Sequence, residues 1–105
     1  MDFNKSTQIL IVEDDERLAE LTREYLTNNG LCVSVEHNGA VAVGRIKAEQ
    51  PDLVILDLML PGEDGLGVCR LVRPEYSGPI IMLTANVDSN SKKLFPKISN
   101  SSEQW

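Results

Sequence analysis

The chain has 105 residues, of which 42% are hydrophobic and 25% charged, and its formal net charge is −6. These values are ordinary for one small globular domain. An acidic chain is repelled by phosphate backbones, so we do not expect it to contact nucleic acid directly. No apolar run approaches the ~20 residues needed to cross a bilayer, and the N-terminus lacks a secretory signal pattern, so we expect a cytoplasmic protein without a membrane segment.

The charge is unevenly distributed along the chain. Residues 1–88 contain 15 acidic and 7 basic residues, whereas residues 89–105 contain 1 acidic and 3 basic residues. The second segment is also rich in serine and has no continuous aliphatic run. We therefore predict a domain over residues 1–88 and a tail of different character over residues 89–105.

Short aliphatic runs over residues 8–12, 53–56 and 80–83 predict strands that are buried on both faces, as in a parallel sheet. Residues 31–36 alternate, with Leu31, Val33 and Val35 on one side, and predict a further strand.

Helices are predicted between these strands. From Arg17 onward, apolar residues recur at helical spacing, and they are Leu18, Leu21, Tyr25 and Leu26. Residues 40–50 and 66–73 form two shorter helical segments, each followed by a proline. The resulting alternation of strands and helices predicts an α/β fold, a doubly wound parallel sheet with helices on both faces.

Polar residues follow three of the predicted strands. They are the pair Glu13-Asp14, then Asp57, and finally Thr84. Ligands bind at the carboxyl ends of the strands in open α/β sheets, so a shared site is expected there. The competing explanation is that each residue merely starts a helix.

The helix-start explanation accounts for some of these acids better than for others. Glu13 and Asp14 begin a run of four acidic residues, and carboxylates are favourable at a helix N-terminus, which explains Asp15 and Glu16 well. Asp57 is not expected to cap a helix, because Pro61 keeps the residue before it out of the helical region.

Three residues carry no expected chemistry. Cys32 and Cys69 are 37 positions apart with no further cysteine or histidine at metal-ligand spacing, so we predict neither zinc nor a disulfide and interpret both as small buried hydrophobic residues. His37 is a lone histidine at a strand end, for which a structural role is favoured.

Three motifs together resemble the receiver domain of bacterial response regulators. They are ILIVEDD (9–15), LVILDLMLPGEDG (53–65) and PIIMLTA (79–85). The MLPGEDG and CRLVR (69–73) segments are most similar to the OmpR/PhoB group and, within it, to the RstA type. The resemblance covers residues 7–85 and implies a flavodoxin-like (CheY-like) fold, whose five parallel strands have the order 2-1-3-4-5.

The resemblance also implies a metal site and a phosphorylation site. Asp57 would be the phospho-acceptor, and Asp14, Asp57 and the backbone carbonyl of Met59 would bind Mg²⁺, with Glu13 acting through water. Mg²⁺ prefers oxygen ligands and keeps several waters, which suits this set. The phosphoryl oxygens would accept hydrogen bonds from Thr84 and from the backbone N–H of Ala85.

The phosphoryl donor implied by the resemblance is a sensor histidine kinase. The chain would then be a phospho-acceptor that assists its own phosphorylation and dephosphorylation, rather than an enzyme. Its pathway would regulate transcription through a DNA-binding output domain, for which no counterpart is expected in these 105 residues.

The chain departs from the family after residue 88. The family's fourth helix, its fifth strand ending in Lys-Pro and its fifth helix have no counterpart in the sequence. Lys97 stands only 13 residues after Thr84 and is not followed by proline, so we do not assign it as the active-site lysine. Pro96 makes an added strand improbable. Residues 79–84 are therefore expected to form an exposed edge strand, so that the chain either self-associates or is only marginally stable.

Two other functions compete with the phospho-acceptor hypothesis. The chain could be a remnant that binds the kinase or itself without signalling. It could also be a Mg²⁺-dependent phosphohydrolase resembling the haloacid dehalogenases, but those enzymes place a second aspartate two residues after the nucleophile, where this chain has Met59.

Overall fold

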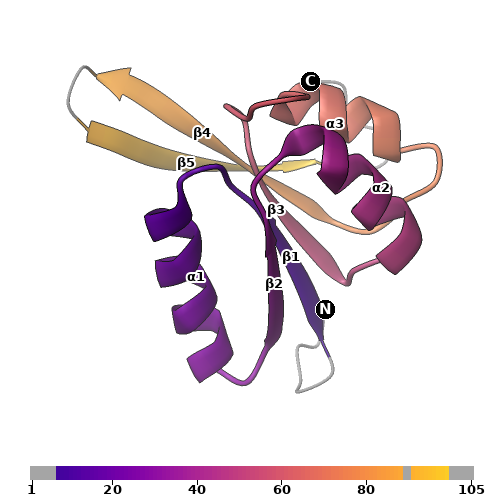
Figure 1. The fold of residues 1–105 in the computed structure, drawn as a ribbon, viewed down its shortest axis with the longest axis horizontal. Coiled ribbons are helices and arrows are strands. Elements are labelled where there is room, and N and C mark those ends of the chain that lie inside the picture. The colour runs from indigo at the N-terminus through magenta and orange to yellow at the C-terminus, as the bar shows by residue number, and fades with distance from the viewer. Residues whose placement is uncertain (1–6, 89–90, 100–105) are drawn as a thin grey trace.

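The computed structural model describes residues 7–88 and 91–99, with side chains from residue 7 to residue 83. Strands and helices alternate along the first part of the chain, and two strands follow one another at its end (Figure 1). The elements are β1 (Gln8–Val12), α1 (Glu16–Asn28), β2 (Cys32–Glu36), α2 (Gly39–Glu49), β3 (Leu53–Asp57), α3 (Gly65–Val72), β4 (Ile80–Asp88) and β5 (Ser91–Ser99).

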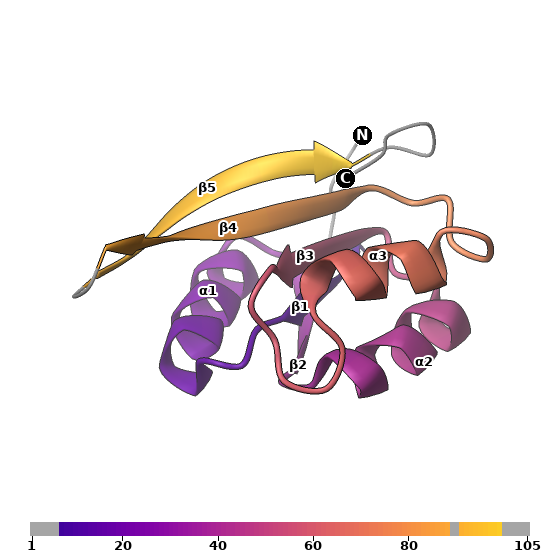
Figure 2. The same cartoon turned by 90° about the horizontal axis from the view of Figure 1, so that it is seen from above.

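One sheet with the strand order β2-β1-β3-β4-β5 forms the centre of the molecule. The first four strands of this order are parallel, and β5 is antiparallel to β4. Helix α1 covers one face of the sheet, and α2 and α3 cover the other (Figure 2). The predicted doubly wound α/β fold is therefore confirmed, with the four parallel strands in the expected order.

The aliphatic runs are continuous because both faces of the central strands are buried. In β1, Leu10 and Val12 belong to the core cluster beneath α2 and α3, whereas Ile9 and Ile11 belong to the cluster on the side of α1. All four side chains are at most 2% exposed. Burying a side chain of this size contributes about 1.5–3 kcal/mol, so β1 contributes strongly to the stability of both layers.

Each helix begins at a side chain that caps it. Asp15 accepts a hydrogen bond from the N–H of Leu18 at 3.0 Å, Asn38 caps α2, and Asp64 caps α3. These caps satisfy N–H groups that have no partner inside the helix. They also fix where each loop at the carboxyl edge of the sheet ends. Among the described residues, no helix is both long and apolar enough to span a membrane.

The predicted apolar face of α1 is partly wrong. Leu21 is 55% exposed and Tyr25 is 69% exposed. The helix instead presents Ala19, which is buried, and Leu26, which packs against the sheet. Because successive residues turn by about 100° around the helix axis, Leu26 shares the face of Ala19, whereas Leu21 and Tyr25 lie on the opposite face.

The two cysteines differ from each other. Cys69 is buried in the core, as predicted. Cys32 is exposed, so its prediction as a buried residue is wrong. It begins β2, which lies at an edge of the sheet, and it lies on the side opposite Val33 and Val35, which pack against the core.

The prediction that Pro96 makes an added strand improbable is also wrong, because Pro96 lies within β5 and pairs with Leu83 of β4. The Leu83 carbonyl accepts a hydrogen bond from the Leu58 N–H at 3.0 Å, on the side away from β5. The N–H and C=O of one strand residue point the same way, so Leu83 and Pro96 form a non-hydrogen-bonded pair. The missing N–H of Pro96 therefore removes no bond from the ladder.

This pairing changes the predicted edge of the sheet. The expectation that the sheet lacks a fifth strand is wrong, because the antiparallel β5 occupies the position next to β4. The prediction of β4 as an exposed edge is therefore wrong. Pairing of β3 with β4 ends at Asp57 and Leu83. In the described ranges, residues 84–88 pair only with β5, and the resulting ribbon extends beyond the sheet (Figure 2).

Candidate metal centre

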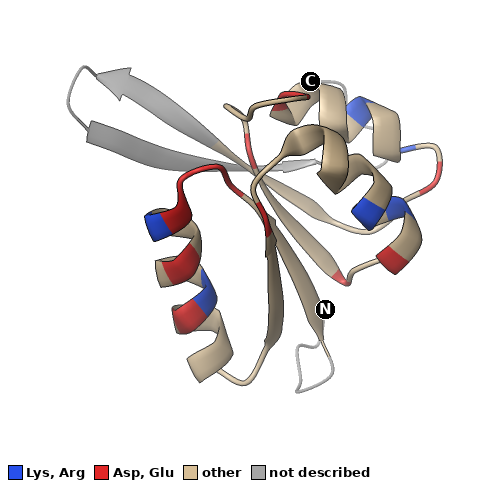
Figure 3. Ribbon diagram, in the orientation of Figure 1, with Lys and Arg blue, Asp and Glu red and all other residues tan. Residues whose placement is uncertain are grey.

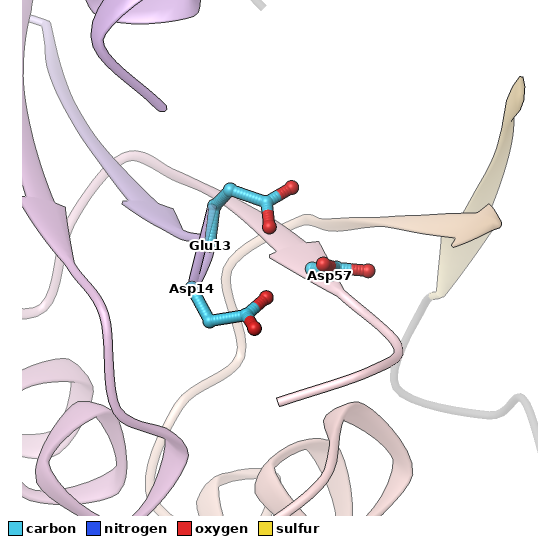
Figure 4. A group of neighbouring side chains, drawn as sticks. All are labelled: Glu13, Asp14 and Asp57. Atoms are coloured by element: carbon cyan, nitrogen blue, oxygen red, sulfur yellow. The ribbon is translucent and has the colours of Figure 1, made fainter. Parts of the chain in front are cut away.

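Three carboxylates meet at the carboxyl edge of the sheet. Glu13 and Asp14 directly follow β1, and Asp57 is the last residue of the neighbouring strand β3. One oxygen from each carboxylate lies within 4.8 Å of the others, and the three side chains turn toward a common space (Figure 4). The predicted convergence of these acids is therefore present in the fold.

The three acids differ in their exposure to solvent. Glu13 is 3% exposed and Asp57 is 1% exposed, whereas Asp14 is exposed. At this separation, two ionised carboxylates repel by about 3–4 kcal/mol when the effective dielectric constant is about 20. Acidic residues also continue from the end of β1 into the start of α1 (Figure 3). A cation bound among these groups would offset the repulsion.

Backbone N–H groups hold two of the carboxylates in place. Glu13 accepts a hydrogen bond from the N–H of Asp15 at 3.0 Å. Asp57 accepts one from the N–H of Met59 at 3.2 Å. Both donors lie in the loops that follow the strands, so the conformation of each loop determines the direction of a carboxylate.

The donor set suits a hard divalent cation. Around an octahedral Mg²⁺ with bonds of about 2.1 Å, ligand oxygens are about 3.0–4.2 Å apart. The three carboxylate oxygens lie within 4.8 Å of one another. Rotation of a carboxylate moves its oxygens by more than the difference between this distance and the range around Mg²⁺. Oxygen-only ligands favour Mg²⁺, Ca²⁺ or Mn²⁺ over zinc. The Met59 carbonyl lies in the same loop as the N–H that contacts Asp57, and its role as a ligand stays a prediction.

A pocket opens beside the acids. Its volume is about 580 Å³, and it is lined by Asp14 together with residues of the loop and helix that follow β3, which are Leu58, Met59, Leu60, Pro61, Asp64 and Leu66. Asp14 joins this pocket to the acid cluster, and the pocket is large enough for a small molecule.

The other predicted site residues lie on the two last strands. Thr84 and Ala85 continue β4 just beyond the pair formed by Asp57 and Leu83. Lys97 lies in β5, in register with Met82. The side chains of Thr84, Ala85 and Lys97 are outside the described part of the chain, so the roles predicted for Thr84 and Ala85 stay predictions.

His37 lies near the site, although the sequence predicts no chemical role for it. The Nδ1 atom of His37 lies 2.7 Å from the carbonyl oxygen of Glu13. These two residues are 24 positions apart, and each directly follows one of two strands, β1 and β2, that pair in the sheet. No local motif marks such a contact, but the expected pairing of β1 with β2 brings their ends together.

Comparison with known proteins supports a specific family. A family model described as the response regulator receiver domain matches residues 9–97. The chain is 47% identical over 77 residues to the transcriptional regulatory protein RstA of Escherichia coli K12, a match that covers 73% of this chain and 32% of that protein. It is 44% identical over 86 residues to the response regulator ArlR of Staphylococcus haemolyticus, covering 82% and 39%. The chain thus spans about a third of the length of these relatives.

Solved structures agree with this assignment. The BeF₃-activated receiver domain of Klebsiella pneumoniae RstA superimposes with a TM-score of 0.72 at 43% identity, covering 78% of this chain and 70% of that one. The response regulator TrrA of Thermotoga maritima, in complex with Mg²⁺-BeF, gives 0.72 at 34% identity, covering 80% and 74%. Since the family model matches most of its length, this chain belongs to the response regulator receiver domain family.

Proposed function

We propose that this chain is a phospho-acceptor domain of a two-component system that receives a phosphoryl group on Asp57 from a sensor histidine kinase. Asp14, Asp57 and the carbonyl of Met59 would hold Mg²⁺, and Glu13 would contact the ion through water. The observation that carries the proposal is the meeting of three carboxylate oxygens within 4.8 Å at the carboxyl edge of the sheet.

The proposed transfer asks little covalent chemistry of the protein. An oxygen of the Asp57 carboxylate forms a bond to phosphorus while the bond between phosphorus and the kinase histidine nitrogen breaks. Positioning and charge compensation dominate such transfers. Asp57 is positioned by the buried strand β3 and by the N–H of Met59. Bound Mg²⁺ would supply positive charge next to the three acids and the transferred group.

Three further points belong to the same proposal. The chain itself carries the phosphoryl group and assists its addition and removal, so the domain is a signalling acceptor rather than an enzyme. Family membership supports a cytoplasmic location, and the names of the relatives support a pathway that regulates transcription. We also propose that the segment after residue 88, which differs in charge from residues 1–88, takes the place of the family's parallel fifth strand as the antiparallel β5.

The direct test is phosphorylation by acetyl phosphate, followed by mass spectrometry. We expect one phosphoryl group, added only when Mg²⁺ is present and located on Asp57. Asp57→Asn should abolish the addition. A matched control is Asp52→Asn, because Asp52 lies at the opposite end of β3, where it accepts a hydrogen bond from the N–H of Gln8, and this variant should be phosphorylated normally.

Two outcomes would contradict the proposal. Addition that is independent of Mg²⁺, or that persists in Asp57→Asn, would place the chemistry elsewhere. A second measurement, transfer from a phosphorylated histidine kinase, separates an acceptor from a domain that only docks. Binding of the kinase without transfer to Asp57 would favour the non-signalling alternative.

A further inference from the structure

The corner between β2 and α2, residues 36–39, contacts both chain segments that carry the acids of the metal centre. The Glu13 N–H donates a hydrogen bond to the Glu36 carbonyl at 3.0 Å. The Nδ1 atom of His37 lies 2.7 Å from the Glu13 carbonyl oxygen. On the other side, the Gly39 N–H donates to the carbonyl of Pro61, in the loop after Asp57, at 3.0 Å. One short corner thus connects the two halves of the site.

The contact with the loop after β3 leaves no room for a side chain. A Cβ atom added at Gly39 would lie 1.7 Å from the carbonyl oxygen of Glu63. From the other side, Gly62 has a φ of +81°, and an added Cβ there would lie 2.7 Å from the Asn38 Oδ1 atom. The first of these obstacles is backbone, which cannot move away as a flexible side chain can. The loop over residues 58–64 therefore rests directly on the first turn of α2.

The corner is itself held firmly. Asn38 Oδ1 accepts hydrogen bonds from the N–H groups of Ala40 at 2.8 Å and Val41 at 3.2 Å. The Glu36 carboxylate accepts from the N–H of Asn38 at 3.3 Å and lies 3.5 Å from the guanidinium of Arg45. A displacement of the corner would thus break several contacts with α2, so it provides a fixed reference for both segments.

We propose that the β2–α2 corner is a positioning element of the metal centre. Gly39 determines how closely the loop that carries Met59 packs against α2, and His37 holds the backbone of Glu13 in position. The inference rests on the proposed function, since it concerns how the same site is held. Neither residue touches the acids' carboxylates in the contacts above. Both act on the backbone that orients those carboxylates, as residues that contact metal ligands from outside the coordination sphere do.

The test compares two glycine substitutions within the same helix. Gly39→Ala forces the loop away from α2, whereas Gly44→Ala adds a methyl group that has nothing within 4 Å. Mg²⁺ affinity is measured by calorimetry and the unfolding midpoint by urea titration. We expect Gly39→Ala to weaken Mg²⁺ binding about tenfold or more, the range found for outer partners of metal ligands. Gly44→Ala should keep the wild-type affinity.

A second variant covers the case in which Gly39→Ala does not fold. His37 is exposed, so His37→Ala should keep the unfolding midpoint, while Mg²⁺ binding weakens about tenfold for the same reason. In the metal-free protein, the amide resonance of Met59 should shift in Gly39→Ala but not in Gly44→Ala. A residue important only for stability would move the midpoint and leave the affinity of the folded protein unchanged.

The outcomes distinguish this inference from the function on which it rests. If the wild-type chain binds no Mg²⁺, the proposed function fails. If the wild type binds Mg²⁺ and Gly39→Ala, when folded, or His37→Ala binds it equally well, only the positioning role is overturned. Weaker binding at an unchanged midpoint supports the role.

Discussion

The two ends of the parallel strands use their polar groups differently. At the amino ends, polar groups of the connections are paired with one another. The buried Tyr76 hydroxyl donates a hydrogen bond to the carbonyl of Pro51 at 2.7 Å, and Arg73 donates to the carbonyl of Gly78 at 2.7 Å. These bonds join the end of α3 to the connections before β3 and β4. The buried Tyr76 hydroxyl is satisfied in this way, which contributes to stability.

At the carboxyl ends, groups of the same charge are brought together. Glu13, Asp14 and Asp57 share one small space, and two of them are almost fully buried. Ionised carboxylates at this separation repel one another, in contrast to the favourable hydrogen bonds at the amino ends. One end of the sheet thus joins the connections to one another, while the other end brings like charges together in an arrangement suited to binding a cation.

The largest expected effect on stability comes from the cation itself. A ligand that binds only the folded state at about 100 times its dissociation constant stabilises by about 2.7 kcal/mol. Mg²⁺ at that concentration should raise the free energy of unfolding of the wild-type chain by this amount in urea titrations. The increase should be much smaller in Asp57→Asn. An equal increase in both proteins would show that the ion acts elsewhere.

The next effect is alkaline destabilisation at the amino ends. Burial raises the pKa of Tyr76 from 10.0 to about 12. Because the unfolded chain loses this proton first, the contribution of Tyr76 is complete below pH 10 and is lost as the pH rises toward 12. The wild type should lose roughly 2 kcal/mol over this interval relative to Tyr76→Phe, which has no proton to lose. A constant difference between the two proteins would contradict the shifted pKa.

At neutral pH, Tyr76→Phe should have a smaller cost. It removes the hydrogen bond to Pro51 and leaves that carbonyl without this donor, which costs about 1 kcal/mol. Urea titration measures the loss of stability. Mg²⁺ affinity should be unchanged, because Tyr76 lies near the amino ends of the strands. A weaker affinity would show that the two ends are coupled.

The smallest expected change in stability is that of Asp14→Asn in the absence of metal. This substitution removes one of the like charges, but Asp14 is exposed, so the free energy of unfolding should rise by no more than about 0.5 kcal/mol. Its Mg²⁺ affinity, measured by calorimetry, should nevertheless fall clearly below that of the wild type. Clear destabilisation without metal would mean that Asp14 supports the fold rather than the site.

Patterns local in sequence predicted much of this architecture. Continuous aliphatic runs mark strands buried on both faces, and the residue that ends each run is then placed at the carboxyl edge. Glu13, Asp14 and Asp57 could therefore be predicted to meet. The same reasoning failed where burial depends on the exact direction of an element, as for Leu21 on α1 and for Cys32 at the edge of the sheet.

The alternation of strands and helices, the parallel sheet and the acids at its carboxyl edge could be predicted from local patterns, because these features depend on periodicity and on strand ends. The last strand depends on how distant segments pack. Pro96 argues against a strand when considered alone, but its missing N–H is harmless opposite Leu83, whose own polar groups face β3. Likewise, the contacts of His37 and Gly39 with the site depend on chain segments that are distant in sequence and adjacent only after folding.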